Sequence, residues 1–159
     1  YSLNRILVPI EFKKPSAKAV KFTQELASIS GANIVLQHVY ENPTQYFPYM
    51  PSESHEQKMK EHLQKKFKKF ADKYGIKNDE CILTPLKEGK AEDEIYNLSL
   101  QEQTDLIVTG ARGKSNTAAL LFEEKSEHMA NYNFRVPLLI YKDKSEHEGL
   151  LQTMLDELS

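Results

Sequence analysis

The sequence predicts an α/β protein, a three-layer sandwich in which a five-stranded, mostly parallel sheet carries helices on both faces. Two observations predict this class. Short apolar runs alternate along the chain with longer segments whose apolar residues recur at helical spacing. The run Leu106, Ile107 and Val108 is apolar without a break, as expected of a strand covered on both faces. The chain has 159 residues, enough for one domain with such a core.

The first elements follow the alternation that this class requires. Residues 4–10 predict a strand, and Pro9 should end it because proline has no backbone N–H to donate. A helix is expected over residues 15–30, with Gly31 as a left-handed cap. Residues 33–39 then predict the second strand. The amino-terminal part of the chain therefore reads as a strand, a helix and a second strand.

Residues 41–53 contain three prolines among aromatic residues, which predicts a loop rather than a regular element. Two interpretations stay open: a loop packed on its own domain, or a lid or partner contact beside a ligand. The next helix is expected to start at a capping box formed by Ser54 and Gln57 and to end at Gly75. An apolar stripe should face the core. The opposite face is lysine-rich and is expected to be solvated; it carries Lys58, Lys60, Lys65, Lys66, Lys68 and Lys69.

The second half continues the alternation and ends in a charged tail. It predicts strands at 80–86, 105–109 and 136–141, helices at 90–103 and 123–134, and a helical tail at 143–159. Gly110 and Gly113 predict a turn directly after the central strand. That turn would lie at the carboxyl ends of the strands, where open α/β sheets bind ligands. A proline in the last strand predicts an edge position.

Composition excludes several classes of protein. The formal charge of −2 argues against a protein built to bind nucleic acid. No apolar run approaches the roughly 20 residues that a membrane-spanning helix needs. Cys81 is the single cysteine, which excludes an internal disulfide and predicts a reducing, cytoplasmic setting. We therefore expect no nucleic-acid partner and no membrane partner.

No catalytic or metal-binding motif is complete, so we predict no catalytic residue and no metal ligand. Ser115, His128 and Asp105 occur without a Gly-x-Ser-x-Gly elbow, and the P-loop lysine motif is missing. His55 and His62 share a helix face but lack a third ligand. His38 lies within a strand and is expected to be structural. These residues name no reaction.

Four stretches together resemble the universal stress protein family: residues 6–12, 37–39, 105–115 and 136–140. The resemblance covers about residues 3–142. It implies an adenine nucleotide alpha hydrolase-like fold, with a family domain over residues 1–142 followed by the tail at 143–159. It also implies a homodimer formed through the strand at 136–141, the segment through which members commonly pair.

The resemblance also implies a nucleotide site. Family members that bind ATP show Gly-x-x-Gly, nine residues, and then Gly followed by Ser or Thr. Gly110 and Gly113 match the first part, but Glu123 and Glu124 stand at the last two positions. If the site is retained, the resemblance implies that Glu11 and the Val39 backbone face the adenosine, and that Gly110 and Gly113 face the ribose and the nearest phosphates. The resemblance also implies that Pro9, Arg112 and Ser126 contact the nucleotide.

The two glutamates predict a degenerate phosphate site. Two like charges about 4 Å apart repel by roughly 4 kcal/mol at an effective dielectric constant near 20. A micromolar ligand has only about 8 kcal/mol of binding free energy in total. The carboxylates can instead cap the helix that follows. Two arrangements would preserve ATP binding: Mg²⁺ bridging Glu123 and Glu124 to the phosphates, or both side chains pointing outward so that Lys114 and Lys125 meet the anion.

The sequence therefore predicts a non-enzymatic stress-response or regulatory domain that acts through dimer or protein-partner contacts and has a degenerate nucleotide site. The alternative is a sensor that binds ATP or AMP, with Mg²⁺, through the loop at residues 110–126.

Overall fold

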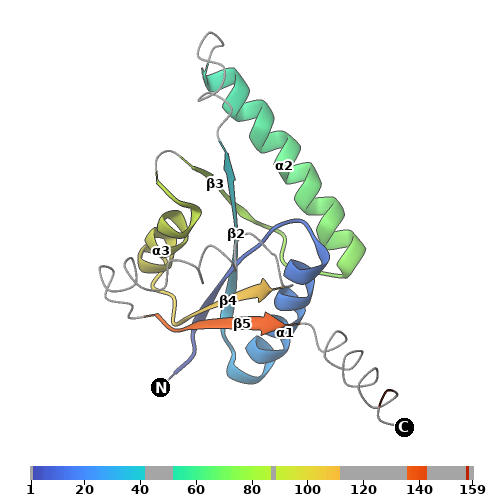
Figure 1. Cartoon of the computed structure of the whole chain (residues 1–159), viewed down its shortest axis with the longest axis vertical. Coiled ribbons are helices and arrows are strands. Elements are labelled where there is room, and N and C mark those ends of the chain that lie inside the picture. The colour runs from blue at the N-terminus through green and yellow to red at the C-terminus, as the bar shows by residue number, and fades with distance from the viewer. Residues whose placement is uncertain (1, 42–51, 87–88, 112–135, 143–156, 158–159) are drawn as a thin grey trace.

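The predicted strands pair into one parallel sheet in the computed structural model, which describes residues 2–41, 52–86, 89–111, 136–142 and 157. The strand order is β3-β2-β1-β4-β5 (Figure 1), and every described pair is parallel. The strands are β1 (Arg5–Pro9), β2 (Asn33–Glu41), β3 (Ile82–Leu86), β4 (Leu106–Ala111) and β5 (Leu138–Lys142). Because β2 and β4 flank β1, the chain reverses its direction of winding beside β1, where such sheets form a crevice.

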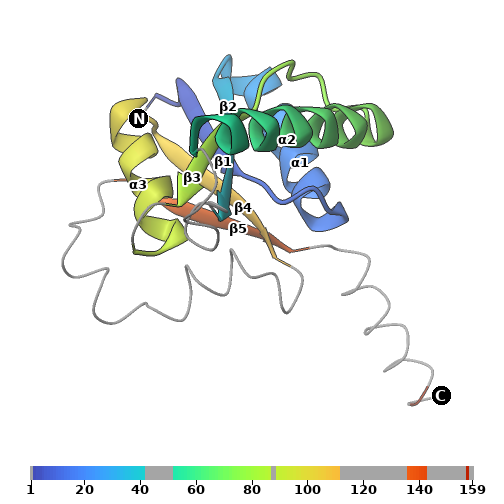
Figure 2. The same ribbon diagram turned by 90° about the horizontal axis from the view of Figure 1, so that it is seen from above.

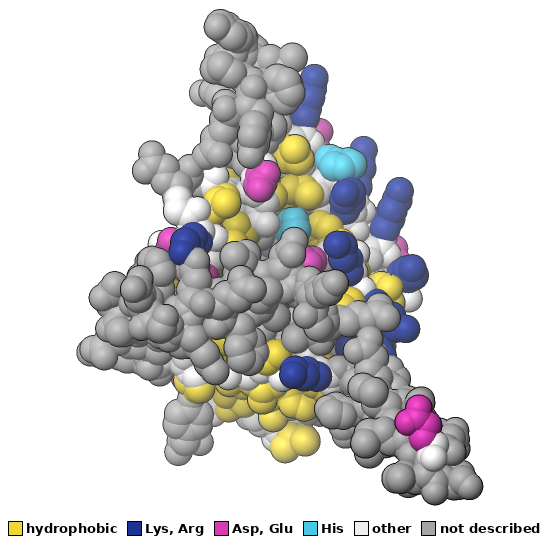
Figure 3. All heavy atoms as spheres, in the orientation of Figure 1, with side chains coloured by type: hydrophobic (Ala, Val, Ile, Leu, Met, Phe, Trp, Pro, Cys, Tyr) yellow, Lys and Arg dark blue, Asp and Glu magenta, His cyan; other side chains and the backbone are white. Residues whose placement is uncertain are grey.

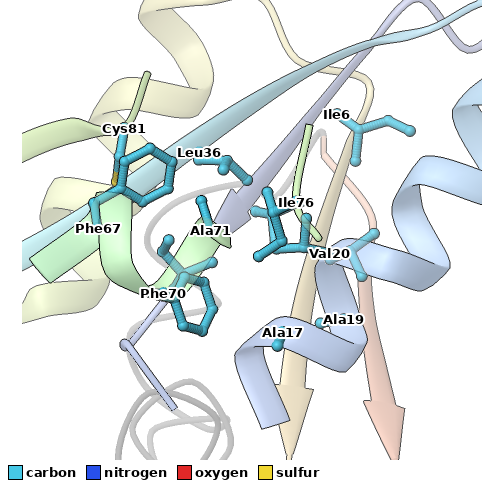
Figure 4. Packing of buried hydrophobic residues seen from close by; sticks show 13 residues of the cluster. Ile6, Ala17, Ala19, Val20, Leu36, Phe67, Phe70, Ala71, Ile76 and Cys81 are labelled. Atoms are coloured by element: carbon cyan, nitrogen blue, oxygen red, sulfur yellow. The ribbon is translucent and has the colours of Figure 1, made fainter. Parts of the chain in front are cut away.

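The described helices lie on both faces of the sheet, as the sequence predicts. Two of them, α1 (Lys14–Ser30) and α2 (Ser52–Tyr74), cover one face, while α3 (Ala91–Gln101) covers the other (Figure 2). The α1/α2 face holds the larger apolar cluster, to which Phe67 and Phe70 of α2 contribute aromatic rings (Figure 4). The three-layer prediction is confirmed.

Strand β1 shows why a continuous apolar run is needed. Ile6 and Val8 pack in the cluster beneath α1 and α2, and Leu7 packs in the cluster beneath α3. All three side chains are fully buried. Full burial of such a side chain contributes about 1.5–3 kcal/mol. Pro9 is the last residue of β1, as predicted, and it pairs with Gln37 of β2.

Several element boundaries differ from the predicted ones. Helix α2 starts at Ser52, so Ser54 lies in its first turn and the predicted capping box is wrong. Strand β2 continues to Glu41 because β3 pairs with it as far as Leu86. The predicted helix at 123–134 and the tail, apart from Glu157, lie outside the described residues.

The outer face of α2 is lysine-rich and solvated, as predicted (Figure 3). Lys65, Lys66, Lys68 and Lys69 are exposed, while Leu63 and Phe67 on the opposite side are buried. Within the described ranges, no helix combines the length and hydropathy that crossing a bilayer requires.

Asp105 joins the amino ends of β1 and β4. Its Oδ2 accepts hydrogen bonds from the backbone N–H groups of Asn4 at 2.7 Å and Arg5 at 3.0 Å. Arg5 in turn forms an ion pair with Glu102 at 3.1 Å. Asp105 therefore lies at the end of the sheet opposite to the carboxyl edge, where it positions backbone rather than a reacting group.

Candidate functional site

A pocket of about 350 Å³ opens at the carboxyl edge of the sheet. The ends of β1, β2 and β3 form one side of it, and the first turns of α3 form another. Ligand pockets in proteins begin at about 300 Å³, so this volume suits a small molecule. Its position is the one at which parallel sheets of this kind bind ligands.

Three of the residues that the resemblance assigns to the nucleotide site, Pro9, Glu11 and Val39, border this pocket. They are brought together because β1 and β2 are in register at their carboxyl ends. The backbone N–H of Ile10 donates to the carbonyl oxygen of Gln37 at 2.7 Å, which continues the pairing by one residue. The N–H of Glu11 then donates to Ser16 Oγ at 2.8 Å, so the turn into α1 is held beside the pocket.

His38 supports the same turn from the α1/α2 face. Its Nδ1 lies 2.8 Å from the carbonyl oxygen of Ile10. A carbonyl can only accept, so Nδ1 carries the proton. The ring packs against Phe12 with 4.4 Å between centroids. Burial lowers the pKa of His38 and favours the neutral imidazole. His38 has the structural role that was expected.

Gly110 is not in a turn, which corrects the predicted boundary. It lies within β4 and pairs with Tyr141, because β5 extends the ladder past Thr109. A Cβ at Gly110 would lie 2.3 Å from the carbonyl oxygen of Pro15 and 3.3 Å from Ala19 Cβ. The missing side chain therefore lets the first turns of α1 pack on β4. Whether Gly110 also contacts a ligand stays a prediction.

The phosphate half of the predicted site is only partly described. Gly110 is described and does not border the pocket. The remaining predicted residues lie outside the described ranges; they are Arg112, Gly113, Ser126 and the two departures Glu123 and Glu124. Within the described ranges, no cluster of three or more His, Cys, Asp or Glu residues could hold a metal ion.

Sequence reasoning missed Gln37, which borders the pocket and is fully buried. Its Nε2 donates to Thr84 Oγ1 at 3.0 Å and to the carbonyl oxygen of Glu94 at 3.3 Å. Its Oε1 is buried and has no hydrogen-bond partner among the described residues. A signal was present, because Val35, Gln37 and Val39 share one face of β2 and only the middle one is polar.

The wall formed by α3 was missed as well. Gly89 and Lys90 border the pocket just before the helix. Gly89 has a φ of +90°, a left-handed conformation that favours glycine. The N–H of Lys90 donates to Asp93 Oδ2 at 3.1 Å, which satisfies a donor at the helix start. A glycine before an acidic helix start is the signal that could have located this wall.

Cys81 is buried directly before β3, within the cluster beneath α1 and α2. Burial raises the pKa of its thiol to about 12. A thiol with so high a pKa holds almost no thiolate near neutral pH, and it is therefore unreactive. Cys81 fills space in the core and contributes no nucleophile.

Comparison with known proteins agrees with the fold. The model of the universal stress protein family matches residues 2–142. Among solved structures, hypothetical protein MJ0577 is similar at a TM-score of 0.63 and 19% identity, covering 90% of this chain and 98% of that chain.

Two further structures were solved as complexes. A universal stress protein in complex with cAMP has a TM-score of 0.56 and 18% identity, over 89% of this chain and 98% of that chain. The universal stress protein from Archaeoglobus fulgidus in complex with dAMP has a TM-score of 0.52 and 18% identity, over 88% and 98%. No curated protein matches the sequence significantly. Because the family match spans most of its length, this chain belongs to the universal stress protein family.

Proposed function

We propose that this protein is a non-enzymatic stress-response domain whose carboxyl-edge pocket binds the nucleoside part of an adenine nucleotide. The observation that carries the proposal is the pocket itself, which Pro9, Glu11 and Val39 border together. The complexes of family members with cAMP and dAMP support a ligand of this class. Both of those ligands carry a single phosphate.

The pocket's chemistry favours the nucleoside over the phosphates. Apolar side chains of Val39, Leu86 and Ile95 border it, as suits a flat aromatic base. Glu11 and Glu41 border it too, and Lys90 is the one basic residue among the described lining. Glu123 and Glu124 add negative charge to the segment that would meet the phosphates. Each further phosphate should therefore weaken binding.

Titration calorimetry with AMP and ATP, each with and without Mg²⁺, tests the proposal. We expect AMP to bind at least about tenfold more tightly than ATP when no Mg²⁺ is present, because each unit of like charge costs on the order of 1 kcal/mol or more near a protein surface. Ala91→Trp should fill the pocket and abolish AMP binding. Asn97→Trp, on the exposed side of the same helix, is the matched control and should bind AMP normally.

The outcomes separate the two candidate functions. If neither nucleotide binds, the nucleoside pocket is refuted and a purely partner-binding domain stands. If ATP binds more tightly than AMP once Mg²⁺ is added, the protein is an ATP sensor in which the metal bridges the glutamates to the phosphates. If ATP binds tightly without Mg²⁺, the degenerate phosphate site is wrong.

We also propose that two copies pair through the strand at residues 136–141, as the resemblance implied. In support, β5 lies at an edge of the described sheet, and its apolar residues Leu138, Leu139 and Ile140 are only half-buried. An apolar edge strand usually finds a partner.

Light scattering should give the mass of a dimer, and Ile140→Lys should convert it to a monomer. Leu100→Lys, at an exposed apolar site on α3, should leave the dimer intact. A monomeric wild-type protein at high concentration would contradict the pairing.

A further inference from the structure

We propose that Gln37 selects the base: its Oε1 accepts a hydrogen bond from the 6-amino group of an adenine ring and so disfavours 6-oxo purines. This assignment rests on the proposed nucleoside pocket and adds a specificity-determining residue to it. Gln37 lies in one of the stretches that carry the family resemblance, but the resemblance assigned it no contact with the nucleotide. It is identified by its place in the fold and by its hydrogen bonds.

The orientation of the Gln37 amide is determined by its partners. Nε2 lies 3.3 Å from the carbonyl oxygen of Glu94, and a carbonyl oxygen can only accept. Nε2 also donates to Thr84 Oγ1 at 3.0 Å. Turning the amide over would place Oε1 against the Glu94 carbonyl, acceptor against acceptor. The side chain is therefore held between β3 and α3 with Oε1 as its remaining acceptor.

The unpaired acceptor belongs to a residue that borders the pocket. Gln37 borders the pocket together with Val39 of β2 and Ile95 of α3. Its side chain is fully buried, and Oε1 has no partner among the described residues. Most buried polar atoms in proteins are hydrogen-bonded. A buried acceptor without a partner, in a residue that borders a pocket, therefore suggests that the ligand supplies the donor.

The missing donor belongs to a neutral group rather than to a phosphate. An ionised phosphate has only acceptor oxygens, and Glu11 and Glu41 on the same lining would repel it. A purine base is flat and uncharged and suits the apolar neighbours of Gln37. Among purines, adenine presents an exocyclic amino donor, whereas hypoxanthine and guanine present a carbonyl at the same position. A carbonyl there would face Oε1 and leave two buried acceptors unpaired.

Binding of three nucleosides to the wild-type protein tests this assignment directly. We expect adenosine to bind most tightly, purine riboside, which lacks the 6-substituent, to bind less tightly, and inosine to bind least. The affinity for adenosine should be about 10- to 100-fold higher than the affinity for inosine, which is the range expected for leaving a buried polar group unpaired. Equal affinities for all three would overturn the role of Gln37 and leave the nucleoside pocket standing. Failure of all three to bind would refute the pocket and this assignment together.

A matched pair of variants locates the discrimination in one side chain. Gln37→Met conserves length and volume but removes the acceptor. This variant should bind adenosine about tenfold more weakly, and its affinities for adenosine and inosine should be nearly equal. Gln64→Met makes the same change at an exposed site on α2 and should leave the ratio of the two affinities unchanged. A ratio that survives Gln37→Met would overturn the assignment. Should that variant fail to fold, the wild-type nucleoside series alone decides.

Discussion

Replacing Glu123 by glycine and Glu124 by serine should raise the affinity of this protein for ATP by about a hundredfold without Mg²⁺. Two like charges about 4 Å apart repel by roughly 4 kcal/mol at an effective dielectric constant near 20. Removing two thirds of one such repulsion corresponds to about a hundredfold gain in affinity for ATP. The change also restores the small residue and the hydroxyl found at these positions in family members that bind ATP. Calorimetric titration of ATP into both proteins measures the gain.

A second double variant separates charge from size. Glu123→Gln with Glu124→Gln removes both charges but keeps side chains of the same length. If repulsion is the cause, this variant should recover most of the gain. If the glutamates instead weaken ATP binding because their side chains keep the backbone away from the phosphates, only the variant with glycine and serine should gain affinity for ATP. The affinity for adenosine, which has no phosphate, should stay constant throughout. An unchanged affinity for ATP in both variants would refute the acidic-substitution argument.

Gly110→Ala should lower the free energy of unfolding by about 3 kcal/mol, the upper part of the range for overpacking a core. The new Cβ would lie 2.3 Å from the carbonyl oxygen and 2.8 Å from the carbonyl carbon of Pro15, both backbone atoms of α1. Neither can move without shifting the helix away from the sheet. Urea denaturation followed by circular dichroism measures the loss.

The control for this change is Gly31, where an added Cβ would contact no other atom within 4 Å. Gly31→Ala adds a Cβ into open space, and the cost comes only from a φ of +76°. We expect about 1 kcal/mol there, clearly less than at Gly110. A protein with Gly110→Ala that keeps its stability but loses AMP binding would show that Gly110 serves the ligand instead of the packing of α1.

The comparison of Gly110 with Pro9 shows what neighbouring residues can encode. Pro9 is the last residue of β1 in the structure, as predicted, and the lack of an N–H on which that prediction rests is a property of the residue itself. Gly110 was predicted to begin a turn, since a glycine after an apolar run usually does. It continues β4 instead, because β5 pairs alongside it and α1 packs against it. Neither contact is visible in the residues next to it.

Some residues of the candidate site could be assigned from the sequence, whereas others could be placed only from the tertiary structure. Pro9, Glu11 and Val39 were assigned from a family resemblance, and the register of β1 with β2 brings them to one pocket. The wall from Gly89 to Ile95 required knowledge of where α3 lies. Asp105, considered as a partner for Ser115 and His128, lies at the opposite end of the sheet from that pocket. A triad cannot be assembled at the pocket from a residue so placed.

By itself, the sequence determined the alternation of strands and helices, the parallel three-layer class and the family, because apolar periodicity and short motifs are local properties. Only the tertiary structure decided that Gly110 packs against α1, that Asp105 joins β1 to β4, and that Gln37 borders the pocket while its Oε1 has no hydrogen-bond partner among the described residues. These depend on which distant segments approach one another. A hydrogen bond or a steric contact is a property of the pair of atoms, and the second atom in each case belongs to another element.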